Sequence, residues 1–237
     1  MPRLDQIIRI IHLEGVLTLL TRIIGYVHEH IVRPYLPTKE DNLAKFNGVY
    51  VSYEKTKYFD GILGLVNYEG PLVRELKDCA APADCIVIVG GGYGVSTTKA
   101  VRYSDKDTEI ISYEGSETMY QRLLCTLSIN NVSEVDARKK IVGDPISVAG
   151  DSVTDESISP SELPESDLLI LDCEGTEKQI LEQMTHQPST IIVETHGQYG
   201  SPVEDVNKIL RRKGYSLKNE TTMSVDKSMS VLKFEVC

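Results

Sequence analysis

Three carboxylates follow an apolar segment in the second half of the chain. Asp172, Glu174 and Glu177 lie within six residues, directly after the apolar run at 168–171. Such acids can bind an ammonium group, position a substrate hydroxyl or hold a hard divalent cation. Acids also stabilise the first turn of a helix, and we expect Glu177 to do so at least in part. Helix capping alone does not explain Asp172, because that residue lies at the tip of the preceding strand.

A second acid and a histidine end the next apolar segment. Glu194 and His196 flank Thr195 after the apolar run at 191–193. Alternate residues of an extended segment point to the same side, so we expect these two side chains to face the same way. His196 could act as a general base, or as a neutral ligand to a metal shared with Asp172 or Glu194. A hydrogen-bonded structural histidine is the open alternative.

A glycine cluster lies between an apolar segment and a predicted helix. Its members are Gly90, Gly91, Gly92 and Gly94. Glycines at a strand-to-helix turn permit a tight bend and let a ligand approach the backbone closely. The dinucleotide fingerprint needs a further glycine where Val95 stands. The spacing therefore favours S-adenosylmethionine over a nicotinamide cofactor.

Two more carboxylates are expected at strand tips near that turn. Glu114 follows the apolar segment 110–113 and lies 20 residues after Gly94. A carboxylate at the tip of the second strand can accept hydrogen bonds from ribose hydroxyls; an exposed loop acid is the alternative. Asp144, at the tip of the expected third strand, is predicted to accept a hydrogen bond from the exocyclic amine of adenine.

Strands and helices alternate from residue 85 onward, which predicts a parallel sheet with helices on both faces. Strands are expected at 85–89, 109–113, 139–142, 167–172, 190–194, 214–219 and 229–236, and helices at 71–78, 94–103, 116–129, 175–184 and 202–212. No helix separates the last two strands, so the last strand should enter the sheet antiparallel. The predicted fold class is a Rossmann-like, doubly wound α/β sheet of seven strands.

Such a sheet has one edge at which the carboxyl ends of its parallel strands meet, and ligands bind there. We therefore expect Asp172, Glu174, Glu194 and His196 to converge on one small volume. Carboxylates crowded in this way repel one another unless a cation, a shared proton or a substrate is present.

The first 60 residues differ from the rest. Residues 4–32 predict a long amphipathic helix that Pro34 and Pro37 end, and Asn47-Gly48 predicts a β-hairpin within 44–60. The apolar stripe of the helix consists of Ile10, Leu13, Leu17, Leu20, Ile24, Val27 and Ile31. We expect the body of the chain or a second subunit to cover this stripe. Docking to a membrane surface or to a partner protein is the alternative.

Composition limits the class of protein further. The chain has 237 residues, of which 41% are hydrophobic, enough for one good core. A net charge of -10 disfavours nucleic acid as a partner. Five cysteines without zinc-ligand spacing predict reduced thiols in a cytoplasmic protein. No apolar stretch approaches the ~20 residues of a transmembrane helix, and charged residues interrupt the N-terminal segment, unlike those of signal peptides.

The order and spacing of these segments resemble those of the FkbM family of class I S-adenosylmethionine-dependent methyltransferases. The resemblance covers roughly residues 60–200. The segments that carry it are Tyr68-Glu69-Gly70-Pro71, Val89-Gly90-Gly91-Gly92-Tyr93-Gly94, Tyr113-Glu114, Asn130-Asn131-Val132, Asp172-Cys173-Glu174-Gly175-Thr176-Glu177 and Glu194-Thr195-His196.

The resemblance implies O-methylation of a hydroxyl on a sugar, glycan or small metabolite, with S-adenosylmethionine as the cofactor. The chain departs from the family at Ile88 and Gly92, where the family often has Asp and Asn. Glu69 or Asp172 would then supply the missing contact to the methionine end. We expect an extension at 1–60 and a methyltransferase domain at 61–237.

Two other functions fit the same residues. One is a nucleotide- or nicotinamide-dependent enzyme on the same fold, and the other is a non-catalytic protein that acts through its N-terminal helix. A pure scaffold would need neither the acids nor the histidine at the strand tips, which favours an enzyme. The sequence leaves open the acceptor, the need for a divalent metal and a homo-oligomeric state.

Overall fold

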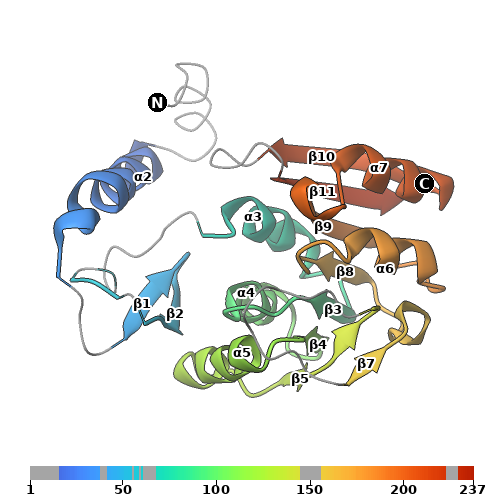
Figure 1. The fold of residues 1–237 in the computed structure, drawn as a ribbon, viewed down its shortest axis with the longest axis horizontal. Coiled ribbons are helices and arrows are strands. Elements are labelled where there is room, and N and C mark those ends of the chain that lie inside the picture. Colours follow the sequence, from blue (N-terminus) through green and yellow to red (C-terminus); the bar gives the residue numbers. More distant parts are fainter. Residues whose placement is uncertain are drawn as a thin grey trace. The chain divides into compact units, whose positions relative to one another are not determined.

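A computed structural model describes residues 16–37, 42–54, 56–58, 60, 68–144, 156–222 and 229–237 (Figure 1). The chain divides into two compact units between Tyr68 and Glu69. The boundary expected after residue 60 precedes residues 61–67, which lie outside the described ranges.

The first unit contains a helix and a hairpin. Helix α2 (Val16–Val27) continues through a π-helical turn (His28–Val32) into a short 3-10 helix (Arg33–Tyr35). Strands β1 (Leu43–Phe46) and β2 (Val49–Ser52) pair antiparallel. Asn47 and Gly48 join them with φ values of 44° and 80°, as a two-residue hairpin turn requires. The predicted hairpin is confirmed.

Asp60 ties the end of the helical segment to the rest of this unit. Its buried carboxylate accepts two hydrogen bonds from the Arg33 Nε and one from the Arg33 Nη2, at 3.0 to 3.1 Å. The Nε2 atom of buried His28 lies 4.0 Å from the same carboxylate. A charge this deeply buried is stable only when it is paired in this way.

The apolar stripe of the N-terminal helix is described in part. Leu20, Ile24, Val27 and Ile31 have exposed fractions between 39% and 58%. Cover of this stripe by the body of the chain or by a second subunit stays a prediction. Ile10 and Leu13 lie outside the described residues. No described helix has the length and apolarity to cross a membrane.

The second unit is built on a seven-stranded sheet in the order β10-β11-β9-β8-β3-β4-β5. Its strands are β3 (Cys85–Val89), β4 (Glu109–Tyr113), β5 (Val135–Arg138), β8 (Leu168–Leu171), β9 (Thr190–His196), β10 (Tyr215–Thr222) and β11 (Met229–Val236). The last strand, β11, runs antiparallel to both of its neighbours. The fold class predicted from the sequence is confirmed.

Helices cover both faces of this sheet (Figure 1). They are α3 (Gly70–Cys79), α4 (Val95–Tyr103), α5 (Glu117–Ile129), α6 (Glu177–Gln183) and α7 (Val203–Arg212), with short 3-10 turns at Pro160–Glu162 and Gly197–Tyr199. Leu72 of α3 and Ala100 of α4 share one core cluster with alternate strand residues such as Ile88. Ile180 of α6 and Leu210 of α7 belong to the cluster on the opposite face.

The prediction that residues 139–142 form a strand of the main sheet is wrong. The edge strand of the sheet is β5, and it pairs through Val135 with Ile110 of β4. Its residues are half-buried or exposed, because an edge strand needs less apolar sequence than a central one. The apolar pair Ile141–Val142 forms β6, which pairs with β7 (Ser157–Ile158) outside the main sheet.

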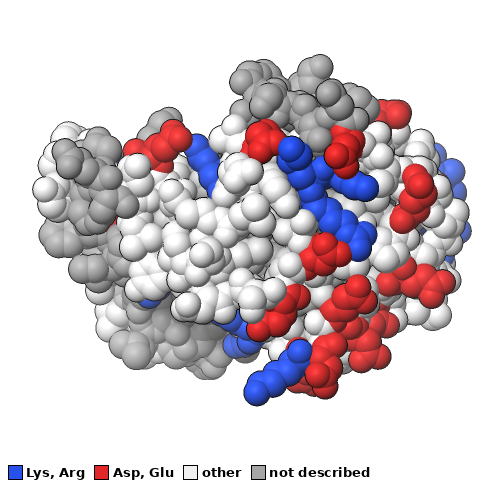
Figure 2. All heavy atoms as spheres, turned by 90° about the horizontal axis from the view of Figure 1, so that it is seen from below, with Lys and Arg blue, Asp and Glu red and all other residues white. Residues whose placement is uncertain are grey.

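Acidic side chains dominate part of the surface. Figure 2 shows one face of the molecule, on which Asp and Glu form a broad red area with a few Lys and Arg side chains among them. A surface of this charge repels phosphate backbones.

The glycine turn after β3 gives a test of the fold. A Cβ on Gly90 would lie 1.8 Å from the backbone oxygen of Asp172, whereas a Cβ on Gly92 would meet no atom within 4 Å. We expect Gly90→Ala to lower the free energy of unfolding by about 3 kcal/mol or more. Gly92→Ala, whose φ is 51°, should cost only about 1–2 kcal/mol of backbone strain. Urea denaturation followed by circular dichroism measures both, and equal costs would contradict the packing described.

Candidate active site

The glycine turn connects the tips of three strands. The backbone N–H groups of Gly90 and Gly91 both donate to the carbonyl of Tyr113, at 2.9 and 3.0 Å, which joins the turn to the end of β4. Gly90 also fits tightly against the Asp172 carbonyl at the end of β8. Only a residue without a side chain allows this approach. The turn therefore lies at the carboxyl edge of the sheet, as predicted.

Glu114 lies at the same edge, directly beside the turn. Its carboxylate accepts hydrogen bonds from the N–H of Gly92 at 2.7 Å and of Ser116 at 2.8 Å. Burial raises the pKa of Glu114, and these two hydrogen bonds oppose the rise. The side chain is buried, so the alternative of an exposed loop acid is wrong.

Glu69 approaches the edge from the residue that precedes α3. Its backbone is left-handed, with φ 51°, and its Oε2 accepts the N–H of Ser96 in the first turn of α4 at 3.1 Å. Its negative charge contributes to a raised pKa of Glu194. Glu69 is thus close enough to the strand tips to influence the ionisation of the side chains there, although it is distant from them in sequence.

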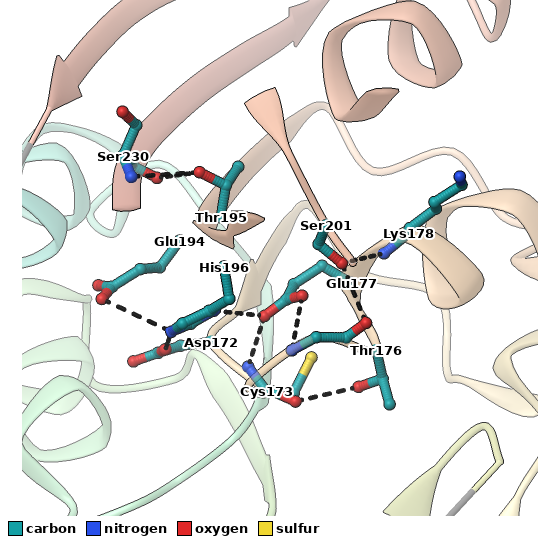
Figure 3. Close-up of polar contacts among 11 residues, drawn as sticks. Asp172, Cys173, Thr176, Glu177, Lys178, Glu194, Thr195, His196, Ser201 and Ser230 are labelled. Atoms are coloured by element: carbon teal, nitrogen blue, oxygen red, sulfur yellow. Dashed lines mark hydrogen bonds and ion pairs between the residues drawn. The ribbon is translucent and has the colours of Figure 1, made fainter. Parts of the chain in front are cut away.

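Three predicted side chains converge at the carboxyl ends of β8 and β9 (Figure 3). The Nε2 atom of His196 lies 3.8 Å from Oδ1 of Asp172 and 4.0 Å from Oε1 of Glu194. Thr195 points away from them and exchanges hydrogen bonds with the backbone of Ser230 on β11, at 3.0 and 3.1 Å. Glu194 and His196 therefore face the same way, as their spacing predicts.

Glu177 lies in the first turn of α6, as predicted. It is fully buried, and its carboxylate accepts the N–H groups of Cys173 at 3.2 Å and Gly175 at 2.9 Å. Its Oε1 also lies 2.8 Å from Nδ1 of His196. The predicted helix-start role is confirmed, and the same carboxylate also orients the histidine. Sequence reasoning missed this contact, since nothing in the local pattern indicates that the side chain is buried.

Two other predicted acids stand apart from this group. Glu174 is exposed and is not one of the three residues whose ligand atoms gather at one point, so its expected convergence is wrong. The adjacent glycine lets the chain turn there, which carries Glu174 outward. Asp144 follows β6 instead of the third strand, is exposed, and accepts a hydrogen bond from Gln179 of α6 at 2.6 Å. Its contact to adenine stays a prediction.

Burial and like charges alter the proton affinities in this group. Burial raises the pKa of Glu194 to about 7, with His196 opposing the rise and Glu69 adding to it. Burial and the charge of Glu194 raise the pKa of Asp172 well above its usual range. Burial lowers the pKa of His196, but the hydrogen bond to Glu177 and the charge of Asp172 outweigh it and raise the pKa to about 9. The group therefore holds protons at neutral pH that separate residues would release.

Comparisons with known proteins show the class of fold. No family model matches the chain, and no curated protein matches it. Among solved structures, an O-methyltransferase family protein from Burkholderia thailandensis superposes with a TM-score of 0.53 and 12% identity over 76% of this chain and 58% of that chain. The ribosomal protein L11 methylase of Lactobacillus delbrueckii subsp. bulgaricus gives 0.50, with 11% identity over 70% and 78%.

A third structure, magnesium protoporphyrin IX methyltransferase from Synechocystis PCC 6803 with bound S-adenosylmethionine, gives a TM-score of 0.50 and 14% identity over 71% of this chain and 77% of that chain. At these identities the likeness concerns the fold. The chain has the Rossmann-like fold of class I S-adenosylmethionine-dependent methyltransferases.

The raised pKa values predict how stability depends on pH. The folded pKa is about 7 for Glu194 against an ordinary 4.5, and about 9 for His196 against 6.5. Both groups bind more protons in the folded state, so their contribution to the free energy of unfolding falls as pH rises. The contribution of Glu194 to the free energy of unfolding is lost between about pH 4.5 and 7, and that of His196 between about pH 6.5 and 9.

Melting temperatures of chelator-treated protein between pH 5 and pH 9 measure this dependence. We expect Glu194→Gln to flatten the lower half of the curve and His196→Gln the upper half. Glu204→Gln, at an exposed position in α7, is the matched control and should keep the wild-type slope. If all three variants share that slope, the proton affinities assigned to the group are wrong.

Proposed function

We propose that the chain is an S-adenosylmethionine-dependent methyltransferase that transfers the methyl group to a hydroxyl oxygen. The observation that carries the proposal is the hydrogen bond from the Gly92 N–H to Glu114, with open space beside Gly92. It joins a glycine turn and a buried carboxylate at adjacent strand tips, where α/β folds of this type bind nucleotides. The structurally similar methyltransferase from Synechocystis carries S-adenosylmethionine, which supports the same cofactor here.

The residues assigned to the cofactor divide by chemistry. The backbone of Gly90, Gly91, Gly92 and Gly94 would lie against the cofactor, and Glu114 would accept hydrogen bonds from the ribose hydroxyls. Ile88 is buried in β3 and offers no acid to the methionine end. Glu69 and Asp172 both lie near Glu194, and we assign the ammonium of the methionine moiety to these acids at the carboxyl edge of the sheet.

Methyl transfer requires the acceptor oxygen, the methyl carbon and the sulfur in line. The oxygen–carbon bond forms as the carbon–sulfur bond breaks, the sulfonium becomes a neutral thioether, and the hydroxyl proton leaves. Holding the reactants in line supplies much of the rate enhancement. Glu194, with its pKa near 7, is suited to receive that proton, since a base works best near the operating pH. Asp172 and His196 would hold the hydroxyl and share the charge.

The motif residues also support an assignment to the FkbM family, and with it a sugar, glycan or small metabolite as the acceptor. Asp172, Glu174 and Glu177 stand in its acidic motif, and Glu194 and His196 in its closing motif. The two motifs are in contact, because Glu177 of the acidic motif is buried against His196 of the closing motif and orients its ring.

Cofactor binding can be tested directly by calorimetry. We expect S-adenosylmethionine and its demethylated product to bind the full chain, and Glu114→Gln to weaken both by about tenfold or more, since a hydrogen bond to a charged group contributes roughly 1.5–3 kcal/mol. Glu109→Gln changes an exposed acid at the opposite end of the same strand and should bind as the wild type does. The absence of binding heat for the wild type, or an equal affinity for Glu114→Gln, would overturn the proposal.

A further inference from the structure

The group at the tips of β8 and β9 has the spacing of an ion site. One ligand atom each from Asp172, Glu194 and His196 lies within 4.8 Å of the others. The distances of 3.8 and 4.0 Å from Nε2 to the two carboxylates are too long for hydrogen bonds. Ligands about 2.1 Å from one ion lie about 3.0–3.4 Å apart. An inward shift of less than about 1 Å would therefore coordinate a cation.

Glu194 supplies an independent sign that something else binds here. The residue is 5% exposed, yet its Oε2 has no hydrogen-bond partner among the described residues. A buried carboxylate oxygen without a partner is costly. Figure 3 shows this carboxylate turned toward the ring of His196, the side from which the other two side chains of the group also approach.

We propose that Asp172, Glu194 and His196 bind one divalent first-row transition cation, such as Mn²⁺ or Zn²⁺. Two carboxylates and one imidazole favour these ions over Mg²⁺ and Ca²⁺, which prefer oxygen ligands alone. Three protein ligands leave open positions for water or for an acceptor oxygen.

Glu177 is the positioning residue of this site. Its ionised carboxylate already accepts two backbone N–H groups, and it accepts the proton of Nδ1 of His196 at 2.8 Å. That bond directs the other ring nitrogen, Nε2, toward Asp172 and Glu194. A carboxylate behind a ligating histidine is the usual arrangement at protein metal sites. Its loss typically weakens metal binding by about 10–100-fold.

With a cation bound, Glu194 would be a ligand and not the proton acceptor, and the cation would acidify an acceptor hydroxyl coordinated to it. That role rests on the proposed function, whereas cation binding itself does not. The two can therefore fail separately.

The test uses the full chain, first treated with a chelator and then titrated with Mn²⁺, while electron paramagnetic resonance follows the free ion. We expect one Mn²⁺ per chain, displaced by Zn²⁺. Glu194→Gln and His196→Gln should weaken binding by about 100-fold or more, and Glu177→Gln by about 10–100-fold. The matched control is Glu204→Gln, an exposed acid in α7, which should leave the affinity unchanged.

Spin-echo modulation from the ring nitrogen separates ligation from structural support. It should persist in Glu177→Gln saturated with Mn²⁺ and vanish in His196→Gln. Circular dichroism checks that each variant is folded, and the nearly isosteric Glu194→Gln decides the matter if His196→Gln does not fold. Failure of the wild type to bind one Mn²⁺ or Zn²⁺, or wild-type affinity in Glu194→Gln, would overturn the cation site.

Titration of S-adenosylmethionine into the same samples separates this inference from the proposed function. Mn²⁺ binding without cofactor binding would support the cation site and overturn the methyltransferase proposal. Cofactor binding without Mn²⁺ or Zn²⁺ binding would support the methyltransferase proposal and overturn the cation site.

Discussion

A single buried carboxylate organises the polar edge of the sheet. Glu177 receives the N–H groups of Cys173 and Gly175 and contacts the ring of His196. Removing one partner from a buried charge typically costs about 3–5 kcal/mol. The loop after β8, the start of α6 and the end of β9 must therefore keep their positions together. The orientation of the histidine, and with it the geometry of the whole group, depends on this interaction.

The parallel register of the sheet brings the remaining groups to the same place. Leu171 of β8 lies opposite Val193 of β9, so Asp172, directly after β8, and Glu194, within β9, come together at the carboxyl edge of the sheet. The close fit of Gly90 against the Asp172 carbonyl adds the glycine turn to this edge. A cofactor on the turn would thus lie beside the acids without any long loop to position it.

The crowding of acids at this edge works against the stability of the fold. Burial and the charges of neighbouring carboxylates raise the pKa values of Asp172 and Glu194, which means that their charged forms are disfavoured in the folded chain. Strongly perturbed groups of this kind gather at functional sites. A cationic ligand would relieve the repulsion, and both a sulfonium cofactor and a divalent cation have the required charge.

The sequence by itself determined the features that depend on neighbours along the chain: the hairpin turn, the order of strands and helices, and the common direction of Glu194 and His196. Periodicity and turn chemistry are local, so one sequence suffices for them. Only the tertiary structure decided that β5 forms the edge of the sheet and that Glu177 is buried against His196. Each of these depends on packing between segments distant in sequence, which local patterns do not encode.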